Sequence, residues 1–190
     1  MGLSFFLEGV KDHTIGSLVP TSKHAAKLIC DELILPKEPS VHVEFGPGDG
    51  AVTKELLNRI GPQDQLIAVE SSLVLMQKLE QKIRDSRLKI VHALAQQALH
   101  EQLKDRRGSV ANIVSGIPFS QIGEVDRAVI FDGMRDLLDP EGHVVIYQFL
   151  SNIKKELEER FDLIKYQWTI RNIPPLYILT AEQKGDEDHR

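Results

Sequence analysis

The chain has 190 residues, of which 42% are hydrophobic and 27% charged, and a formal net charge of −5 at pH 7. This length fits one domain with its own core, and the composition is that of a globular protein without a low-complexity tract. The negative charge argues against a partner held mainly through phosphate contacts, and the single cysteine, Cys30, excludes an intramolecular disulfide.

The sequence contains no targeting or membrane-spanning signal. Met1–Val10 is too short for a signal peptide and lacks its basic start. No apolar run reaches the roughly 18 residues of a membrane span. The expected compartment is therefore the cytoplasm.

Short apolar runs alternate with amphipathic segments along the chain, separated by capping and breaking residues. The first half predicts a helix from Thr21 or Ser22 to about Leu35, a strand at 41–45, a helix at 51–60, a strand at 66–69, a helix capped by Ser71 or Ser72, and a strand at 88–93. The second half predicts a helix at 98–104, a strand at 110–114, a helix at 124–138, a strand at 144–149, a helix at 153–159, and strands at 164–170 and 177–180.

This order of elements predicts an α/β fold. Five alternations of strand and helix imply right-handed crossovers and a parallel, doubly wound sheet with helices on both faces. Only residues 171–176 separate the last two strands, which is too short for a helical crossover, so the last of seven strands should run antiparallel. We expect the domain to span residues 21–183 and the polar residues 184–190 to form a disordered tail.

A glycine-rich turn after the first strand, residues 44–50, carries the strongest functional signal. In doubly wound sheets, ligands bind at the carboxyl ends of the strands where the strand order reverses. Glycines allow close approach of the backbone, and N–H groups at the following helix start can meet a carboxylate. Glu44 suits an ammonium group, and Glu70, at the end of the second strand, suits ribose hydroxyls. These features predict a site for S-adenosylmethionine, whose expected contacts are Glu44, Phe45, Gly46, Pro47, Gly48, Gly50, Glu70, Ser71, Leu94, Ala95 and Ser115.

Two other interpretations of this turn stay open. Gly46, Gly48 and Ala51 formally match the dinucleotide pattern G-x-G-x-x-A. Against it, an acid two residues before the first glycine would repel a pyrophosphate, and the chain lacks room for a second nucleotide half and a substrate domain. The turn could also be purely structural. No metal is expected, because the seven histidines are scattered without ligand spacing.

A second motif, Asn112–Phe119, ends the fourth predicted strand. In this kind of fold that end faces the transferable methyl group. We expect Ser115, Gly116, Ile117 and Pro118 to orient an amine toward the sulfonium. A plain turn over a core aromatic is the alternative.

Four stretches together resemble the bacterial phospholipid N-methyltransferases of the soluble, Rhodobacter type: residues 16–22, the glycine turn, Ser115–Pro118 and Trp168–Pro175. The resemblance extends from Phe5 to about Leu179, and that family is itself similar to the ribosomal RNA adenine dimethylases. It implies a Rossmann-like class I methyltransferase fold. It also implies methyl transfer to the amine of phosphatidylethanolamine and its methylated products. Residues 1–20 would then cover the active site and contact lipid at the inner membrane face.

The sequence departs from that family in two places. Ala93-Leu94-Ala95 replaces a Gly-Asp-Ala run, which removes the acid expected at the adenine amino group and leaves Gln96 or Gln97 as a replacement. Ser151 stands where the family has a tyrosine. Two alternatives therefore stay open: an RNA adenine N6-methyltransferase, and a non-catalytic binding protein of the same fold. The negative charge, and the end of the chain soon after the last strand, make nucleic acid the less expected partner.

Overall fold

The computed structural model describes residues 20–149 and 153–184. Most of the predicted N-terminal cover (1–20), the predicted tail beyond Lys184, and Ser151 lie outside the described residues.

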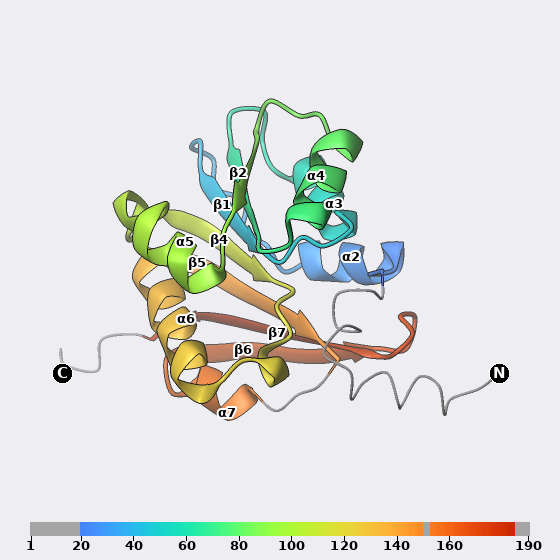
Figure 1. Ribbon diagram of the computed structural model, residues 1–190. Helices are drawn as coiled ribbons and strands as arrows, with labels where there is room; N and C mark the ends of the chain where they lie inside the picture. The colour runs from blue at the N-terminus through green and yellow to red at the C-terminus, as the bar shows by residue number, and fades with distance from the viewer. Residues whose placement is uncertain (1–19, 150–152, 185–190) are drawn as a thin grey trace.

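Seven strands form one sheet in the order β3-β2-β1-β4-β5-β7-β6 (Figure 1). Strands β1 to β5 are parallel, and β7 runs antiparallel to both β5 and β6. The prediction of a mostly parallel sheet with an antiparallel last strand is thus confirmed. The strands are β1 (Val41–Phe45), β2 (Gln65–Glu70), β3 (Leu88–His92), β4 (Val110–Ser115), β5 (Leu138–Gln148), β6 (Phe161–Thr169) and β7 (Leu176–Gln183).

Helices cover both faces of the sheet (Figure 1), as predicted. One core cluster packs Ile29 and Leu56, from two helices, against Val145 and Ile178 of the sheet. The cluster on the other face includes Phe119 and Phe131, whose rings stack at 4.7 Å between centroids. The helices are α2 (Lys23–Cys30), α3 (Ala51–Arg59), α4 (Leu73–Lys82), α5 (Ala95–Glu101), α6 (Glu124–Leu137) and α7 (Lys154–Glu158), with 3₁₀ turns at Lys104–Arg106 and Phe119–Gln121.

The first helix is shorter than predicted. Ser22 caps it by accepting a hydrogen bond from the Ala25 N–H, but it ends at Cys30 rather than near Leu35. The backbone of Ile34 is instead bound to β4, because its N–H donates to Asn112 Oδ1 (3.0 Å) and its carbonyl accepts from Asn112 Nδ2 (2.7 Å). A contact 78 residues away in sequence therefore ends this helix.

Other boundaries also differ from prediction, two of them next to the predicted site and in the centre of the sheet. Helix α5 begins at Ala95 rather than Ala98, and the Leu94 N–H at its start donates to Gln97 Oε1 (3.4 Å). Strand β5 begins at Leu138, directly after α6, rather than at Val144. Leu138 is fully buried and pairs with Val110 of β4, so tertiary packing extends the strand beyond its apolar run.

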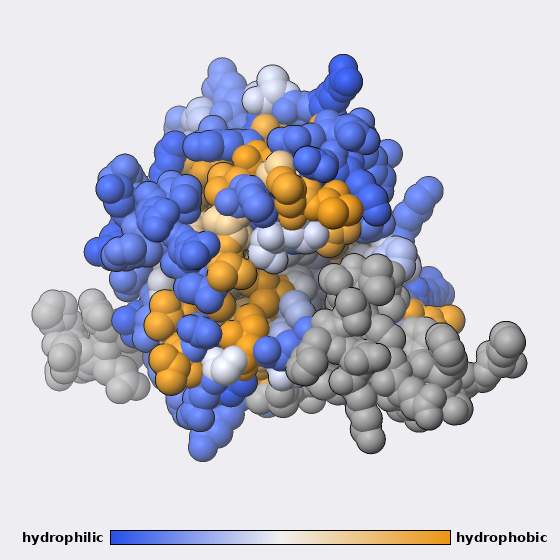
Figure 2. All heavy atoms as spheres, in the orientation of Figure 1, coloured by the Kyte–Doolittle hydropathy of each residue, from blue (hydrophilic) through white to orange (hydrophobic). Residues whose placement is uncertain are grey.

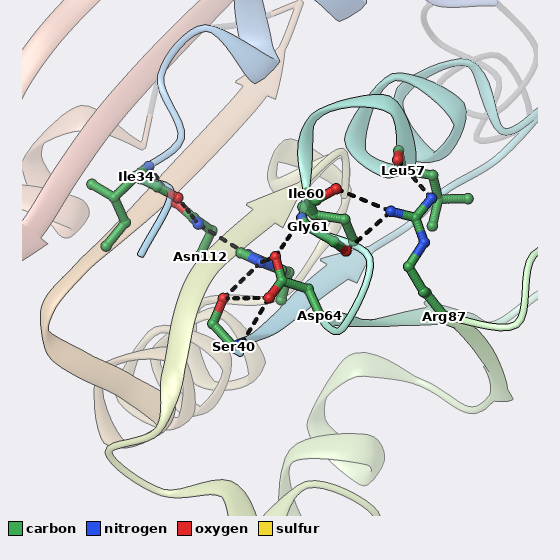
Figure 3. A network of polar contacts seen from close by, with 9 residues as sticks. Ile34, Ser40, Leu57, Ile60, Gly61, Asp64, Arg87 and Asn112 are labelled. Atoms are coloured by element: carbon green, nitrogen blue, oxygen red, sulfur yellow. Dashed lines mark hydrogen bonds and ion pairs between the residues drawn. The ribbon is translucent and has the colours of Figure 1, made fainter. Parts of the chain in front are cut away.

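Hydrogen bonds between polar side chains connect the strands and loops at the amino edge of the sheet, the edge where the parallel strands begin (Figure 3). Asn112 Nδ2 lies 3.0 Å from His42 Nδ1, and Asp64 accepts hydrogen bonds from the Ser40 N–H (2.9 Å) and the Gly61 N–H (2.6 Å). Burial lowers the pKa of His42, although the nearby Asp64 carboxylate opposes this shift. Uncharged His42 therefore acts as a hydrogen-bonded core residue.

Arg87 closes the end of α3 in the same view (Figure 3). Its guanidinium donates to the carbonyls of Leu57 (2.8 Å), Ile60 (3.0 Å) and Gly61 (3.2 Å), and it pairs with Asp85 at 2.7 Å. These bonds satisfy carbonyl groups that the helix end leaves unpaired. The amino edge is thus held by structural polar contacts, and the opposite edge carries the predicted site.

Candidate active site

The glycine turn and the β4 loop meet where the strand order reverses, between β1 and β4. The Gly46 N–H donates to the Val69 carbonyl of β2, and the Gly116 N–H donates to the Phe45 carbonyl of β1, both at 2.9 Å. A Cβ on Gly46 would lie 3.4 Å from the carbonyl carbon of Gly116 and from the Ile117 nitrogen. The two motifs that the sequence predicts to bind cofactor and acceptor are therefore direct neighbours.

The conformation of the turn explains its glycines. Gly46, Gly48 and Gly50 have φ angles of +73°, +55° and +80°, in the left-handed region that residues with a Cβ rarely adopt. Gly50 caps α3. A Cβ on Gly48 would meet no atom of a described residue within 4 Å. The backbone of the turn is thus open for close approach of a ligand at Gly48.

Glu70 lies beside this turn at the end of β2. Its Oε2 accepts from the Gly48 N–H (3.2 Å) and its Oε1 from the Ser72 N–H (2.8 Å). Glu70 as a residue is 5% exposed, and each carboxylate oxygen still has a lone pair for a further donor. This is the position that the sequence assigns to ribose recognition.

Glu44 lies beneath the turn and is fully buried. Its Oε2 accepts a 2.6 Å hydrogen bond from Thr53 Oγ1 of α3, but Oε1 has no partner among the described residues. Burial raises the pKa of Glu44 to about 8; the Thr53 hydrogen bond opposes this shift, and the charges of Glu70 and Asp49 add to it. An enclosed carboxylate with one unpartnered oxygen is suited to a cationic ligand.

The loop after β4 contains the predicted acceptor-binding residues. Ser115 is fully buried, and its Oγ accepts a hydrogen bond from the Ile117 N–H at 3.4 Å, so it holds the shape of the loop. Gly116, Ile117 and Pro118 are partly exposed. A Cβ on Gly116 would lie 2.5 Å from Cζ of Tyr147, because this ring packs directly against the glycine.

Sequence reasoning missed two residues at the end of β5. Tyr147 is 7% exposed and forms the wall behind Gly116. Gln148 is 6% exposed, and both polar atoms of its amide lack a partner among the described residues. Both residues fall within the predicted strand at 144–149. Their polar groups, at the carboxyl end of an otherwise apolar strand, are the sequence feature that could have indicated a role in the site.

The remaining predicted contacts lie along the same edge. Ser71 and Leu94 are exposed at the ends of β2 and β3, and Ala95 is buried in the first turn of α5. Gln97 Oε1 bonds the Leu94 N–H, which leaves Gln96 less constrained as the replacement for the missing acid. In residues 20–149 and 153–184, no three His, Cys, Asp or Glu side chains cluster as metal ligands.

The sequence profile of the ribosomal RNA adenine dimethylases matches residues 16–125, more than half of the chain. The chain belongs to the ribosomal RNA adenine dimethylase family. It is also 29% identical over 158 residues to ribosomal RNA small subunit methyltransferase H of Methylobacillus flagellatus, covering 74% of this chain and 48% of that protein. The chain therefore spans about half the length of this curated relative.

Solved methyltransferases share its fold. An N-methyltransferase, NodS from Bradyrhizobium japonicum with bound S-adenosylhomocysteine, superposes with a TM-score of 0.68 at 14% identity, over 88% of this chain and 90% of that one. Precorrin-6y C5,15-methyltransferase from Geobacter metallireducens gives 0.68 at 18% identity, over 87% and 92%. At these identities the likeness shows the fold alone, which is the predicted Rossmann-like class I fold.

Membership of this family, together with the fold that the chain shares with solved methyltransferases, agrees with the predicted enzyme class and cofactor, S-adenosylmethionine-dependent methyl transfer. The residues at the carboxyl edge fit this cofactor on three counts. As far as residues 20–149 and 153–184 show, Glu44 has an unpartnered buried oxygen and the turn is open at Gly48, and Glu70 retains acceptor capacity beside it. The dinucleotide interpretation is therefore set aside, whereas the resemblance to phospholipid N-methyltransferases stays a prediction.

Proposed function

We propose that this methyltransferase acts on an uncharged amine nitrogen held against the loop Ser115–Pro118. The observation that carries the proposal is that the cofactor turn and the proline loop are adjacent: a Cβ added to Gly46 would lie 3.4 Å from the carbonyl carbon of Gly116. Glu70 and the turn would hold the nucleoside, and Glu44 would face the ammonium group. The carbonyl groups of Gly116 and Ile117 would accept hydrogen bonds from the acceptor amine.

The cofactor supplies an activated methyl group on a sulfonium. In the transfer the N–C bond forms as the C–S bond breaks, and the nitrogen then loses its extra proton to water. The protein contributes by holding the nitrogen in line with the methyl group and excluding water, and such positioning is worth about 7–11 kcal/mol. Glu44 is enclosed behind the turn and Glu70 binds two backbone N–H groups, so neither is placed as a base beside the loop.

Family membership favours the N6 amine of an RNA adenine as the acceptor. This amine is uncharged at neutral pH and needs no base before attack. The amide of Gln148, at the end of β5, offers one donor and one acceptor, the combination with which Asn and Gln recognise adenine. In the sequence analysis, an RNA adenine N6-methyltransferase was the alternative to the phospholipid N-methyltransferase.

A second acceptor, the amine of a phospholipid, is favoured by the surface around the site. In the described part of the chain, seven of the eleven exposed large apolar side chains lie at the carboxyl edge, at the starts of α4, α5 and α6 or on the β6–β7 hairpin. Figure 2 shows apolar atoms gathered from α4 across to α5 and α6. The net charge of −5 also suits a lipid better than an RNA backbone. The seven are Leu73, Val74, Leu94, Val125, Trp168, Ile170 and Ile173.

Neither acceptor requires a membrane span. In the described part of the chain, no helix is long and apolar enough to cross a bilayer.

One assay with two arms separates the acceptors. The full chain is incubated with methyl-labelled S-adenosylmethionine and either ribosomal RNA or phosphatidylethanolamine vesicles, and label is counted in each. We expect label in RNA adenine, released as N6-methylated adenosine after digestion. Label found in the lipid alone would favour the phospholipid amine as the acceptor instead. Label found in neither RNA nor lipid would contradict both proposed acceptors. Trp168→Ser is expected to lower transfer only to vesicles, because this exposed side chain lies on the hairpin and not at the loop.

A further inference from the structure

A row of side chains leads away from the acceptor loop across one face of the sheet. Ser115, at the start of this loop, pairs in register with Ile146 of β5, and Gln148 lies two residues further along that strand. Gln148 pairs with Tyr177 of β7, the strand between β5 and β6 (Figure 1). Ile146 and Tyr177 both pack in the core cluster on the α6 side, so Gln148 lies on this side as well.

Tyr177 is one half of a stacked pair of tyrosines. Its ring stacks with that of Tyr166 on β6, with 5.8 Å between the ring centroids and 15° between the ring planes. Tyr166 is 41% exposed, and Tyr177 is half-buried. Lys154 Nζ, at the start of α7, lies 5.6 Å from the centroid of the Tyr166 ring. Aromatic rings on an open sheet face are a surface on which proteins stack unpaired bases of RNA.

The row is polar as well as aromatic, which favours RNA over a lipid surface. Gln148 is 6% exposed, and its amide lacks a partner among the described residues. Such an amide can pair with the edge of a base but not with a hydrocarbon chain. Lys154 and Lys155 are exposed on α7, and Lys154 pairs with Glu158 at 3.5 Å. Exposed ion pairs of this kind are weak, so a phosphate group can replace Glu158.

We propose that Tyr166 and Tyr177 form a stacking platform for an unpaired base that lies one or two nucleotides from the target adenine. This inference rests on the proposed function, since it extends the same RNA beyond the acceptor loop. Neighbouring strands are about 4.8 Å apart, so β7 lies about 10 Å from β4, a distance that one or two unstacked nucleotides span. Lys154 binds the phosphate group beside the stacked base. An RNA duplex cannot use the platform, because its bases are already stacked and paired.

The first test needs no substitution in the protein. The wild-type chain, with S-adenosylhomocysteine added, is titrated into a fluorescent oligouridine RNA with one central adenine, and anisotropy gives the dissociation constant. We expect tighter binding to the single strand than to the same RNA in a duplex. One abasic position within two nucleotides of the adenine should weaken binding about 5- to 150-fold, the range for one lost stacked base. Equal binding to strand and duplex, or no effect at any abasic position, would overturn the proposal.

Variants then assign the effect to the tyrosine stack. Tyr166→Ala should weaken single-strand binding by the same factor, whereas Tyr166→Phe keeps the ring and should bind within about twofold of wild type. Tyr166→Ala should lose little more on the sensitive abasic RNA, because both changes remove one contact. Trp168→Ser is the matched control: it removes an exposed aromatic side chain from the same strand, outside the stacked pair, and should bind RNA like wild type. Equal losses in Trp168→Ser and Tyr166→Ala would contradict a platform made by the tyrosines.

The outcomes separate this inference from the proposed function. Methyl label in RNA, with unchanged RNA binding by Tyr166→Ala, would overturn the platform and leave the acceptor in place. RNA binding that depends on Tyr166, with no methyl label in RNA, would support the platform and contradict the acceptor. If Tyr166→Ala weakened binding to phosphatidylethanolamine vesicles and not to RNA, this face would contact lipid and the inference would be wrong.

Discussion

Replacing Gly116 by alanine is expected to lower the rate of methyl transfer about 100-fold or more, with cofactor affinity changed by less than about tenfold. The added methyl group would lie 2.5 Å from Cζ of Tyr147, so either the ring or the loop must move. A displacement of the acceptor by about 1 Å costs on the order of 100-fold in rate. The rate is measured by single-turnover methyl transfer to whichever acceptor, RNA or lipid, becomes labelled. The cofactor affinity is measured by titration with S-adenosylhomocysteine.

Gly123→Ala is the matched control for this substitution. Gly123 precedes α6 and has a φ of −61°, and within the structure's described ranges a Cβ there would meet no atom within 4 Å. The same chemical change close to the loop should therefore leave the rate within about twofold of wild type. If Gly116→Ala were as active as Gly123→Ala, the loop would not hold the acceptor.

Glu70→Ala is expected to weaken S-adenosylmethionine binding about 100-fold. The substitution removes the acceptor proposed for the ribose hydroxyls, and it also leaves the N–H groups of Gly48 and Ser72 without their partner. Hydrogen bonds to a charged group contribute about 1.5–3 kcal/mol each, and 100-fold corresponds to about 2.7 kcal/mol. Calorimetry with S-adenosylhomocysteine measures the loss.

Two further variants distinguish loss of the bond to the cofactor ribose from loss of the structure of the glycine turn. Glu70→Gln keeps an amide oxygen for one N–H group and should lose only about tenfold. Glu124→Ala removes an exposed carboxylate from the first turn of α6 and should bind like wild type. If the Glu70→Ala variant unfolds at the wild-type temperature and binds S-adenosylhomocysteine with unchanged affinity, Glu70 does not contact the cofactor.

Local patterns were sufficient to predict the fold and the position of the glycine turn, whose cofactor role remains a proposal. The period of the apolar residues indicates each strand, and only a turn with left-handed positions explains glycine at 46, 48 and 50. Glu70 could be placed because the carboxyl ends of parallel strands share one edge. The acceptor loop was predicted from the short motif Asn112–Phe119 at the end of the fourth strand rather than from periodicity, and the family resemblance included the same stretch.

Nonlocal contacts account for what the sequence did not show. The early end of α2 depends on Asn112, 78 residues from Ile34, and the early start of β5 depends on pairing with β4. Tyr147 was overlooked because an aromatic residue in a buried strand usually belongs to the core. Its contact with Gly116 becomes visible only once β5 lies beside β4.

The cofactor is proposed to bind at the glycine turn between β1 and β4. The most direct measurement is a set of amide NMR spectra recorded while S-adenosylhomocysteine is added, since glycine signals fall in a separate region. We predict that Gly46, Gly48, Gly50 and Gly116 shift, whereas Gly61, Gly108 and Gly142, at the opposite edge of the sheet, do not. Shifts confined to those three, with the turn unaffected, would contradict the account.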